Sequence, residues 1–166
     1  MLTGDMLRRS AERFPDKPAI IGLGATLSYQ ALDQASNRFA RALRATGAGD
    51  GAKVAILSRN LPQYGVVFFG AARSGLVLVN ISIQYAADEL EYVLGKSDSE
   101  ILVVDGQLAA KAAAVLPRCP RIRTVVVIGE PQAALPGAIG FEAFLAGQPA
   151  DALDLAPEET APFCMT

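Results

Sequence analysis

The sequence predicts an α/β fold in which a mainly parallel sheet carries helices on both faces. Four short apolar runs support this prediction, because they lack the polar alternation of half-exposed strands and are typical of strands covered on both faces. They are residues 54–57, 76–79, 101–104 and 125–128. Helical patterns separate these runs, and strands joined by a crossover helix are almost always parallel.

The chain before the first apolar run predicts a short helix and a hairpin. Residues 6–14 have the spacing of a helix with Leu7, Ala11 and Phe14 on one face, and prolines follow at once. Two short strands, 19–21 and 27–29, then flank a turn that contains two glycines.

The next segment has the clearest amphipathic pattern in the chain. Ser28 can cap this helix by accepting a hydrogen bond from a free backbone N–H, and Gly47 stands where helices commonly end. Apolar residues recur at helical spacing from Leu32 to Leu43, which predicts a buried stripe. The polar residues between them, including Asn37, are expected on the solvent side.

Residues 54–81 form a strand–helix–strand unit around which the other elements are arranged. We expect Asn60 to cap the central helix, Pro62 to occupy its first turn and Gln63 to reach back as in a capping box. The helix is apolar nearly all round, which predicts burial on more than one side.

Further helices are expected over residues 88–94 and 108–116, with one helical turn over 141–145. Residues 1–148 are therefore predicted to form one α/β subdomain. Residues 149–166 are predicted to be an exposed linker.

Composition narrows the classes of function. The chain has 166 residues, about one domain, and a net charge of −2, which gives no argument for nucleic-acid binding. No apolar run approaches the roughly 20 residues of a membrane helix, and no basic-then-apolar leader opens the chain. The chain contains no His, so histidine triads, histidine metal sites and histidine general bases are excluded within it.

These observations predict a cytoplasmic protein with no membrane span and no nucleic-acid partner. Cys119 and Cys164 lack metal-like spacing and are expected to be free thiols. Apolar residues make up 51% of the chain, which predicts either an unusually large core or an exposed apolar surface through which a homo-oligomer could form.

Ligands of open parallel sheets gather at the carboxyl ends of the strands. Ser82, Gln84 and Tyr85 follow the second buried strand and are candidate cofactor-binding residues on position alone. Asp105 and Glu130 follow the third and fourth strands, but isolated carboxylates are more often turn or cap residues. No catalytic set and no metal site is recognisable.

Several segments resemble, in the same order, the N-terminal region of adenylate-forming (AMP-binding) acyl-CoA synthetases, which are acid–thiol ligases. These segments are residues 27–32, 37–43, 54–57, 60–64, 69–75 and 89–94. The resemblance covers residues 1–166 and implies the N-terminal subdomain of the acyl-CoA synthetase-like fold. It also implies a fragment that stops just before the Gly/Ser/Thr-rich phosphate loop of the family.

The resemblance implies a two-step reaction. A carboxylate attacks the α-phosphate of ATP to give an acyl-adenylate, and the thiol of coenzyme A then displaces AMP. The full-length enzyme would use ATP, Mg²⁺ and coenzyme A in fatty acid metabolism. Its substrate would be a carboxylic or fatty acid, and the partner of this fragment would be the remainder of its own polypeptide. The fragment alone is expected to be inactive and to bind none of the cofactors.

Two segments depart from the family pattern. The usual Pro-x-Asn-Pro is replaced by residues 80–83, so no family role is carried over to the candidate residues of this loop. The usual Thr-Pro is replaced by Ala86-Ala87, which removes a helix cap worth about 1 kcal/mol. The alternative is a stand-alone flavodoxin-like binding or self-association module without enzymatic activity. A nucleotide-binding domain of that kind needs a glycine loop after a first strand, and the sequence shows none.

Overall fold

The computed structural model describes residues 3–22, 25–153 and 163–164. Within them, six strands form a sheet: β3 (Lys53–Leu57), β4 (Val77–Asn80), β5 (Ser99–Asp105), β6 (Thr124–Ile128), β7 (Ile139–Gly140) and β8 (Phe163–Cys164). Their order is β7-β6-β5-β3-β4-β8, and every neighbouring pair is parallel. The predicted parallel sheet is confirmed.

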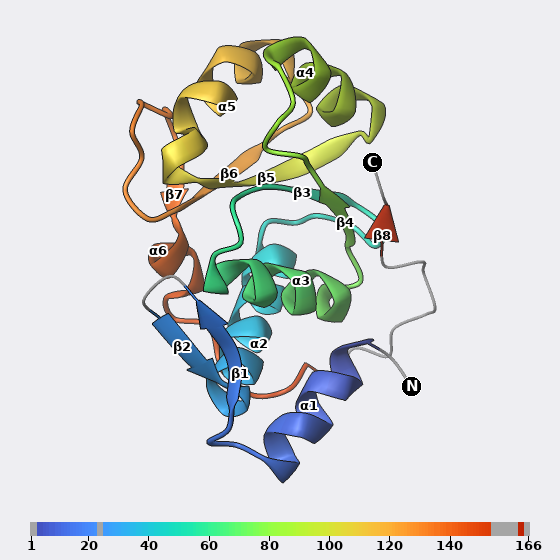
Figure 1. The fold of residues 1–166 in the computed structure, drawn as a ribbon. Helices are drawn as coiled ribbons and strands as arrows, with labels where there is room; N and C mark the ends of the chain where they lie inside the picture. Colours follow the sequence, from blue (N-terminus) through green and yellow to red (C-terminus); the bar gives the residue numbers. More distant parts are fainter. Residues whose placement is uncertain (1–2, 23–24, 154–162, 165–166) are drawn as a thin grey trace.

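Helices cover both faces of this sheet, as predicted (Figure 1). One face carries α2 (Tyr29–Ala45) and α3 (Pro62–Ser74), and the other carries α4 (Ala87–Lys96) and α5 (Ala109–Val115). Short 3₁₀ turns, η1 (Gly106–Leu108) and η2 (Leu116–Arg118), flank α5. The single helical turn predicted near the end is α6 (Phe141–Leu145). Among the described residues, no helix is both long enough and apolar enough for a membrane crossing.

The strands are apolar on both faces because each face meets a separate core layer. In β3, Val54 and Ile56 join the layer beneath α2 and α3, whereas Ala55 and Leu57 join the layer beneath α4 and α5. All four side chains are fully buried. The absence of polar alternation in the sequence is therefore explained by burial on both sides of the sheet.

The N-terminal elements are α1 (Thr3–Arg13) and an antiparallel hairpin of β1 (Pro18–Gly22) and β2 (Ala25–Ser28). The helix predicted to end at Phe14 ends one residue earlier, at Arg13, and Phe14 is 39% exposed. Two cations lie over the Phe14 ring, with the Lys17 ammonium 4.1 Å and the Arg13 guanidinium 5.2 Å from its centroid.

The two long helices differ in how they begin. At α2 the predicted cap is confirmed, since the Ser28 hydroxyl accepts a hydrogen bond from the Ala31 N–H at 3.2 Å. At α3 the predicted cap is wrong: Leu61 is the N-cap residue and no side chain caps the helix, so neither Asn60 nor Gln63 has its expected role. Pro62 does occupy the first turn, where its missing N–H costs little.

Asn37 is buried rather than solvent-facing, which corrects the sequence expectation. Its side-chain oxygen accepts a hydrogen bond from Arg73 of α3 at 2.7 Å. The same arginine pairs with Asp33 at 2.5 Å and donates to the Gly4 carbonyl of α1 at 3.0 Å. The guanidinium of Arg73 thus joins α1, α2 and α3, and it buries Asn37 while Gln34 and Arg38 of the same helix stay exposed.

The segment after α6 returns to α2. Its backbone carbonyls at Ala150, Asp151 and Ala152 accept hydrogen bonds from Asn37 at 2.8 Å and from Arg41 at 3.1 Å. Residues 154–162 and 165–166 of the predicted linker lie outside the described residues, and Phe163–Cys164 pairs with β4 as β8. The division of the chain at residue 148 stays a prediction.

Candidate functional site

The direction of the chain across the sheet reverses at β3. From β3 the chain passes through α3 to β4 on one side, and it then crosses back to β5 on the other side. The helix after β3 belongs to one core layer and the helix after β5 to the other, so the two connections diverge at the carboxyl edge. In open α/β sheets this switch point is where ligands bind.

An ion pair between Arg59 and Asp105 lies at this switch point. The Arg59 Nε and Nη2 atoms donate to the two carboxylate oxygens at 2.5 and 3.2 Å. Asp105 is 3% exposed at its side chain, whereas Arg59 is 46% exposed. Asp105 is not isolated, because β3 and β5 are neighbours in the sheet although the two residues are 46 positions apart. Its expected role as a cap residue is confirmed, since its carboxylate caps η1 by accepting from the Gln107 N–H at 3.0 Å.

The surroundings of Asp105 favour its ionised form. Burial on its own raises the pKa of this carboxyl group, but hydrogen bonds from Arg59 and from the Gln107 N–H outweigh burial and hold the pKa below its ordinary value. The same pairing raises the pKa of Arg59. The pair thus places two opposite charges at the carboxyl ends of β3 and β5, of which the arginine remains accessible.

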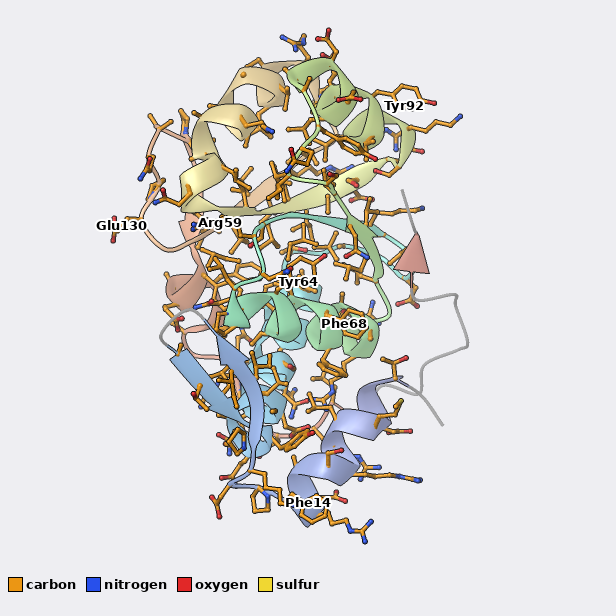
Figure 2. The ribbon with its side chains drawn as sticks, in the orientation of Figure 1. Phe14, Arg59, Tyr64, Phe68, Tyr92 and Glu130 are labelled. Carbon is orange, nitrogen blue, oxygen red and sulfur yellow. The ribbon has the colours of Figure 1, made fainter. Side chains whose placement is uncertain are left out.

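Glu130 follows the carboxyl end of β6, the strand that neighbours β5. Its side chain is exposed, and Figure 2 shows it on the same edge of the molecule as Arg59. Its backbone carbonyl lies directly against Gly106, where a Cβ atom would overlap it. The Gln132 N–H also donates to the Gly106 carbonyl at 2.9 Å, so the connection after β6 is held close to η1. Nothing in this geometry gives the Glu130 carboxylate a chemical role.

Two further polar groups at this edge are occupied within the protein. The Tyr64 hydroxyl, in the first turn of α3, donates to the side-chain oxygen of Asn80 at the end of β4, at 2.7 Å. Burial raises the pKa of Tyr64, so this hydroxyl stays protonated. The Ser58 hydroxyl donates to the backbone carbonyl of Arg59 at 2.8 Å. These contacts stabilise the strand ends and do not form a catalytic set.

The three candidate cofactor-binding residues lie in the loop that follows β4, at the predicted edge. Ser82 and Gln84 are exposed, whereas Tyr85 is half-buried against the core layer of α4 and α5. β4 borders β3 on the side away from β5, so this loop lies one strand from the Arg59–Asp105 pair. Their role as cofactor contacts stays a prediction.

Lys111 of α5 is a site residue that no sequence pattern predicted. Its ammonium donates to the backbone carbonyls of Ile83 at 2.6 Å and Tyr85 at 2.7 Å. Only the placement of α5 beside the β4–α4 connection brings these groups together, and that placement depends on the strand order.

The described residues contain no ready-made cluster of metal-ligating side chains. Across residues 3–22, 25–153 and 163–164, no three Asp, Glu, Cys or His side chains gather as a metal site requires. Cys119 is a free, buried thiol whose pKa is raised by burial. The side chain of Cys164 lies outside the described residues.

The sequence matches known ligases. A family model described as "AMP-binding enzyme" matches residues 7–166. A medium/long-chain-fatty-acid–CoA/3-oxocholest-4-en-26-oate–CoA ligase of Mycobacterium marinum is 32% identical over 124 residues, which are 75% of this chain and 22% of that protein. The fatty acid–[acyl-carrier-protein] ligase ScoC of Streptomyces coeruleorubidus is 35% identical, over 75% of this chain and 24% of that protein. This chain matches less than a quarter of the length of these two relatives.

Solved structures show the same fold. The anthranilate CoA ligase AuaEII, solved in complex with anthranoyl-AMP, superposes with a TM-score of 0.90 at 22% identity, over 99% of this chain and 31% of that one. A long-chain-fatty-acid CoA ligase of Rhodopseudomonas palustris, described as putative, superposes with a TM-score of 0.83 at 27% identity. The superposition covers 93% of this chain and 39% of that one. The matched region is the N-terminal part of such ligases.

Proposed function

Because this chain belongs to the AMP-binding enzyme family, we propose that it forms the N-terminal part of an ATP-dependent ligase that joins a carboxylic acid to a thiol. The family match over residues 7–166 carries this proposal. The names of the relatives support it, since they are ligases that use coenzyme A or an acyl-carrier protein. Membership in the family confirms the resemblance predicted from the sequence.

The proposed reaction has two steps. The carboxylate of the acid attacks the α-phosphate of ATP and releases pyrophosphate, and the thiol then attacks the acyl-adenylate and releases AMP. The fatty acid ligases among the relatives favour a fatty acid as the substrate class. The carboxyl edge of the sheet would form one wall of the site. There the polar side chains of Ser82 and Gln84 would face the reactants.

We expect the groups that bind the ATP phosphates and Mg²⁺ to come from chain outside residues 1–166. The described strand ends carry no glycine loop that leads from a strand into a helix, and the described acidic residues form no metal cluster. We also expect a cytoplasmic enzyme. Isothermal titration calorimetry on residues 1–166 alone tests the first expectation, because micromolar ATP affinity would contradict it.

The decisive experiment uses the complete natural polypeptide that contains these residues. Exchange of labelled pyrophosphate into ATP, measured with a panel of fatty and aromatic acids, reports the first step independently of the thiol. We expect exchange with at least one acid. Failure with every acid would overturn the ligase proposal in favour of the stand-alone binding or self-association module.

A second experiment identifies the thiol that receives the acyl group. One relative is a fatty acid–[acyl-carrier-protein] ligase, which makes a carrier-protein thiol a specific alternative to coenzyme A. Thioester formation with coenzyme A and with a phosphopantetheinylated carrier protein, measured side by side on the same acyl-adenylate, separates the two. We expect coenzyme A to be preferred, because several of the fatty acid ligases among the relatives are named as CoA ligases.

A further inference from the structure

The loop between β4 and α4, residues 81–86, is held by a single side chain from another element. Lys111 of α5 lies 28 residues from Ile83 and 26 residues from Tyr85, and its ammonium donates to both backbone carbonyls. An ammonium has three donors and no acceptor, so two of the three serve this loop. Because the ammonium is charged, these bonds are stronger than bonds between neutral groups.

Three backbone amides of this loop are also paired. The Gln84 N–H donates to the Ser82 hydroxyl at 3.2 Å, and the Tyr85 N–H donates to the Ser82 carbonyl at 3.2 Å. The Ala86 N–H donates to the Glu89 carboxylate at 2.8 Å. The amides of Gln84, Tyr85 and Ala86 thus bond within the loop or to α4, and the carbonyls of Ile83 and Tyr85 bond to Lys111. The described part of the loop thus has a defined hydrogen-bonded conformation. Two contributions come from outside the loop and α4: the ammonium of Lys111, and the Ile56 carbonyl of β3, which accepts from the Ile81 N–H at 3.0 Å.

The clamp acts on the buried side of the loop and leaves the other side open. Ile83 and Tyr85 are half-buried and pack against the core layer of α4 and α5, whereas Ser82 and Gln84 are exposed. Holding the carbonyls of Ile83 and Tyr85 therefore determines how Ser82 and Gln84 are presented at the carboxyl edge of the sheet.

Apart from the turn at Ser82, the sequence of the loop restricts its backbone little. Residues 81–86 contain neither proline, which would restrict the backbone, nor a sequence of turn residues such as Asn-Gly. A loop of ordinary residues next to a ligand edge samples several conformations unless tertiary contacts hold it. Ile81 is anchored at the start of the loop by its bond to Ile56, and Lys111 supplies the side-chain hydrogen bonds that hold the middle of the loop, at Ile83 and Tyr85.

We infer that Lys111 is a positioning residue, which fixes the β4–α4 loop so that Ser82 and Gln84 meet a reactant of the ligase reaction. This inference rests on the proposed function for the reactant, but the clamp itself does not. Lys111 acts through two backbone carbonyls and need not touch any reactant.

Hydrogen exchange of the complete natural polypeptide tests the clamp. In Lys111→Met we expect the amides of Gln84, Tyr85 and Ala86 to exchange about tenfold faster, because local opening no longer breaks the two ammonium bonds. Lys111→Arg should restore most of the protection, since a guanidinium can also donate to two carbonyls. Lys96→Met removes an exposed lysine at the end of α4 and should leave the three amides unchanged. Unchanged exchange in Lys111→Met would overturn the inference.

Steady-state kinetics on the same variants test the positioning role. In Lys111→Met we expect the KM of at least one of ATP, acid and thiol to rise about fivefold, with kcat nearly unchanged, because the loop is loosened and no reacting group is removed. Lys111→Arg should recover the KM. Faster exchange with all three KM values unchanged would overturn the positioning role.

The two experiments separate failure of this inference from failure of the proposed function. If the wild-type polypeptide shows no pyrophosphate exchange with any acid, the ligase proposal and the positioning role fail together, while hydrogen exchange still decides the clamp. If Lys111→Met does not fold, Lys111→Gln takes its place, since its amide keeps donors for one carbonyl. For Lys111→Gln we then expect amide protection and KM values between those of the wild type and those of a variant that has lost both bonds. Wild-type protection and wild-type KM values would overturn the inference.

Discussion

Asp105 is a buried carboxylate whose partners come from two different elements. Arg59 follows β3, and the Gln107 N–H belongs to η1 directly after the carboxylate. Together they lower the pKa of Asp105 in the folded protein below its ordinary value of 3.8. A group with a lowered folded pKa stabilises the fold above its unfolded pKa, and this contribution is lost as the pH falls through the folded pKa.

The substitution Asp105→Asn should therefore cost stability at neutral pH and progressively less in acid. We expect the urea midpoint of the variant to lie below that of the wild type at pH 7. The gap should narrow below the ordinary pKa of 3.8, as the wild-type carboxylate is itself protonated. Glu130→Gln, at an exposed carboxylate on the same edge, is the matched control. Its urea midpoint should differ little from that of the wild type at every pH. A gap for Asp105→Asn that does not depend on pH would contradict the assigned ion pair.

Gly106 is required by close approach rather than by its backbone angles. A Cβ atom at this position would overlap the backbone carbonyl of Glu130, which cannot move without displacing the connection after β6. We expect Gly106→Ala to lower the free energy of unfolding by about 1–3 kcal/mol. Gly95→Ala is the control: it lies inside α4 with open space around it, and should stabilise by about 0.5–1 kcal/mol. Thermal denaturation measures the stability of both variants. If Gly106→Ala and Gly95→Ala change the stability equally, the close approach at Gly106 is contradicted.

At the scale of elements, α4 begins with half of a capping box. The Glu89 carboxylate reaches back to the Ala86 N–H at 2.8 Å, but the alanine methyl group cannot accept the reciprocal hydrogen bond. Ala86 is exposed and has the extended backbone of an N-cap residue, with φ −68° and ψ 171°. The cap missing from the sequence is thus also missing from the structure.

Ala86→Ser should complete this capping box. The added hydroxyl can accept from the free N–H of the first turn, which should stabilise the protein by about 1 kcal/mol and raise Tm by roughly 2–4 °C. Ala87→Ser, one position inside the helix, adds the same hydroxyl without the capping geometry and should not raise Tm. Differential scanning calorimetry compares the two. If both variants melt at the same temperature, the stabilisation does not come from capping.

At the scale of the whole molecule, strand order decides which groups share the carboxyl edge. Placing β5 beside β3 brings Asp105 to Arg59, and placing β4 on the other side of β3 leaves its loop within reach of Lys111. Much of the high apolar content is used in two core layers rather than one. The large apolar side chains exposed in the described part of the chain are distributed over several elements, at Met6, Phe14, Ile21, Tyr92 and Ile139. Self-association through an apolar surface therefore stays a prediction.

The sequence alone determined the elements and the class of the fold. Continuous apolar runs located all four central strands, and helical spacing located the helices between them, to within a few residues. Ser28 and Pro62 marked helix starts correctly, because such signals act between residues that are neighbours in the chain. The family was also visible in the sequence, since its segments recur in order along the chain.

Only the tertiary structure decided the partners of the polar groups. The sequence could not show that Asp105 meets Arg59, that Asn37 is buried beneath the returning segment, or that Lys111 holds the β4–α4 loop. It also placed the cap of α3 at Asn60, whereas the N-cap residue is Leu61, which packs against the core. Each of these outcomes depends on contacts between residues that strand order and helix packing bring together, and periodicity along the chain carries no information about that order.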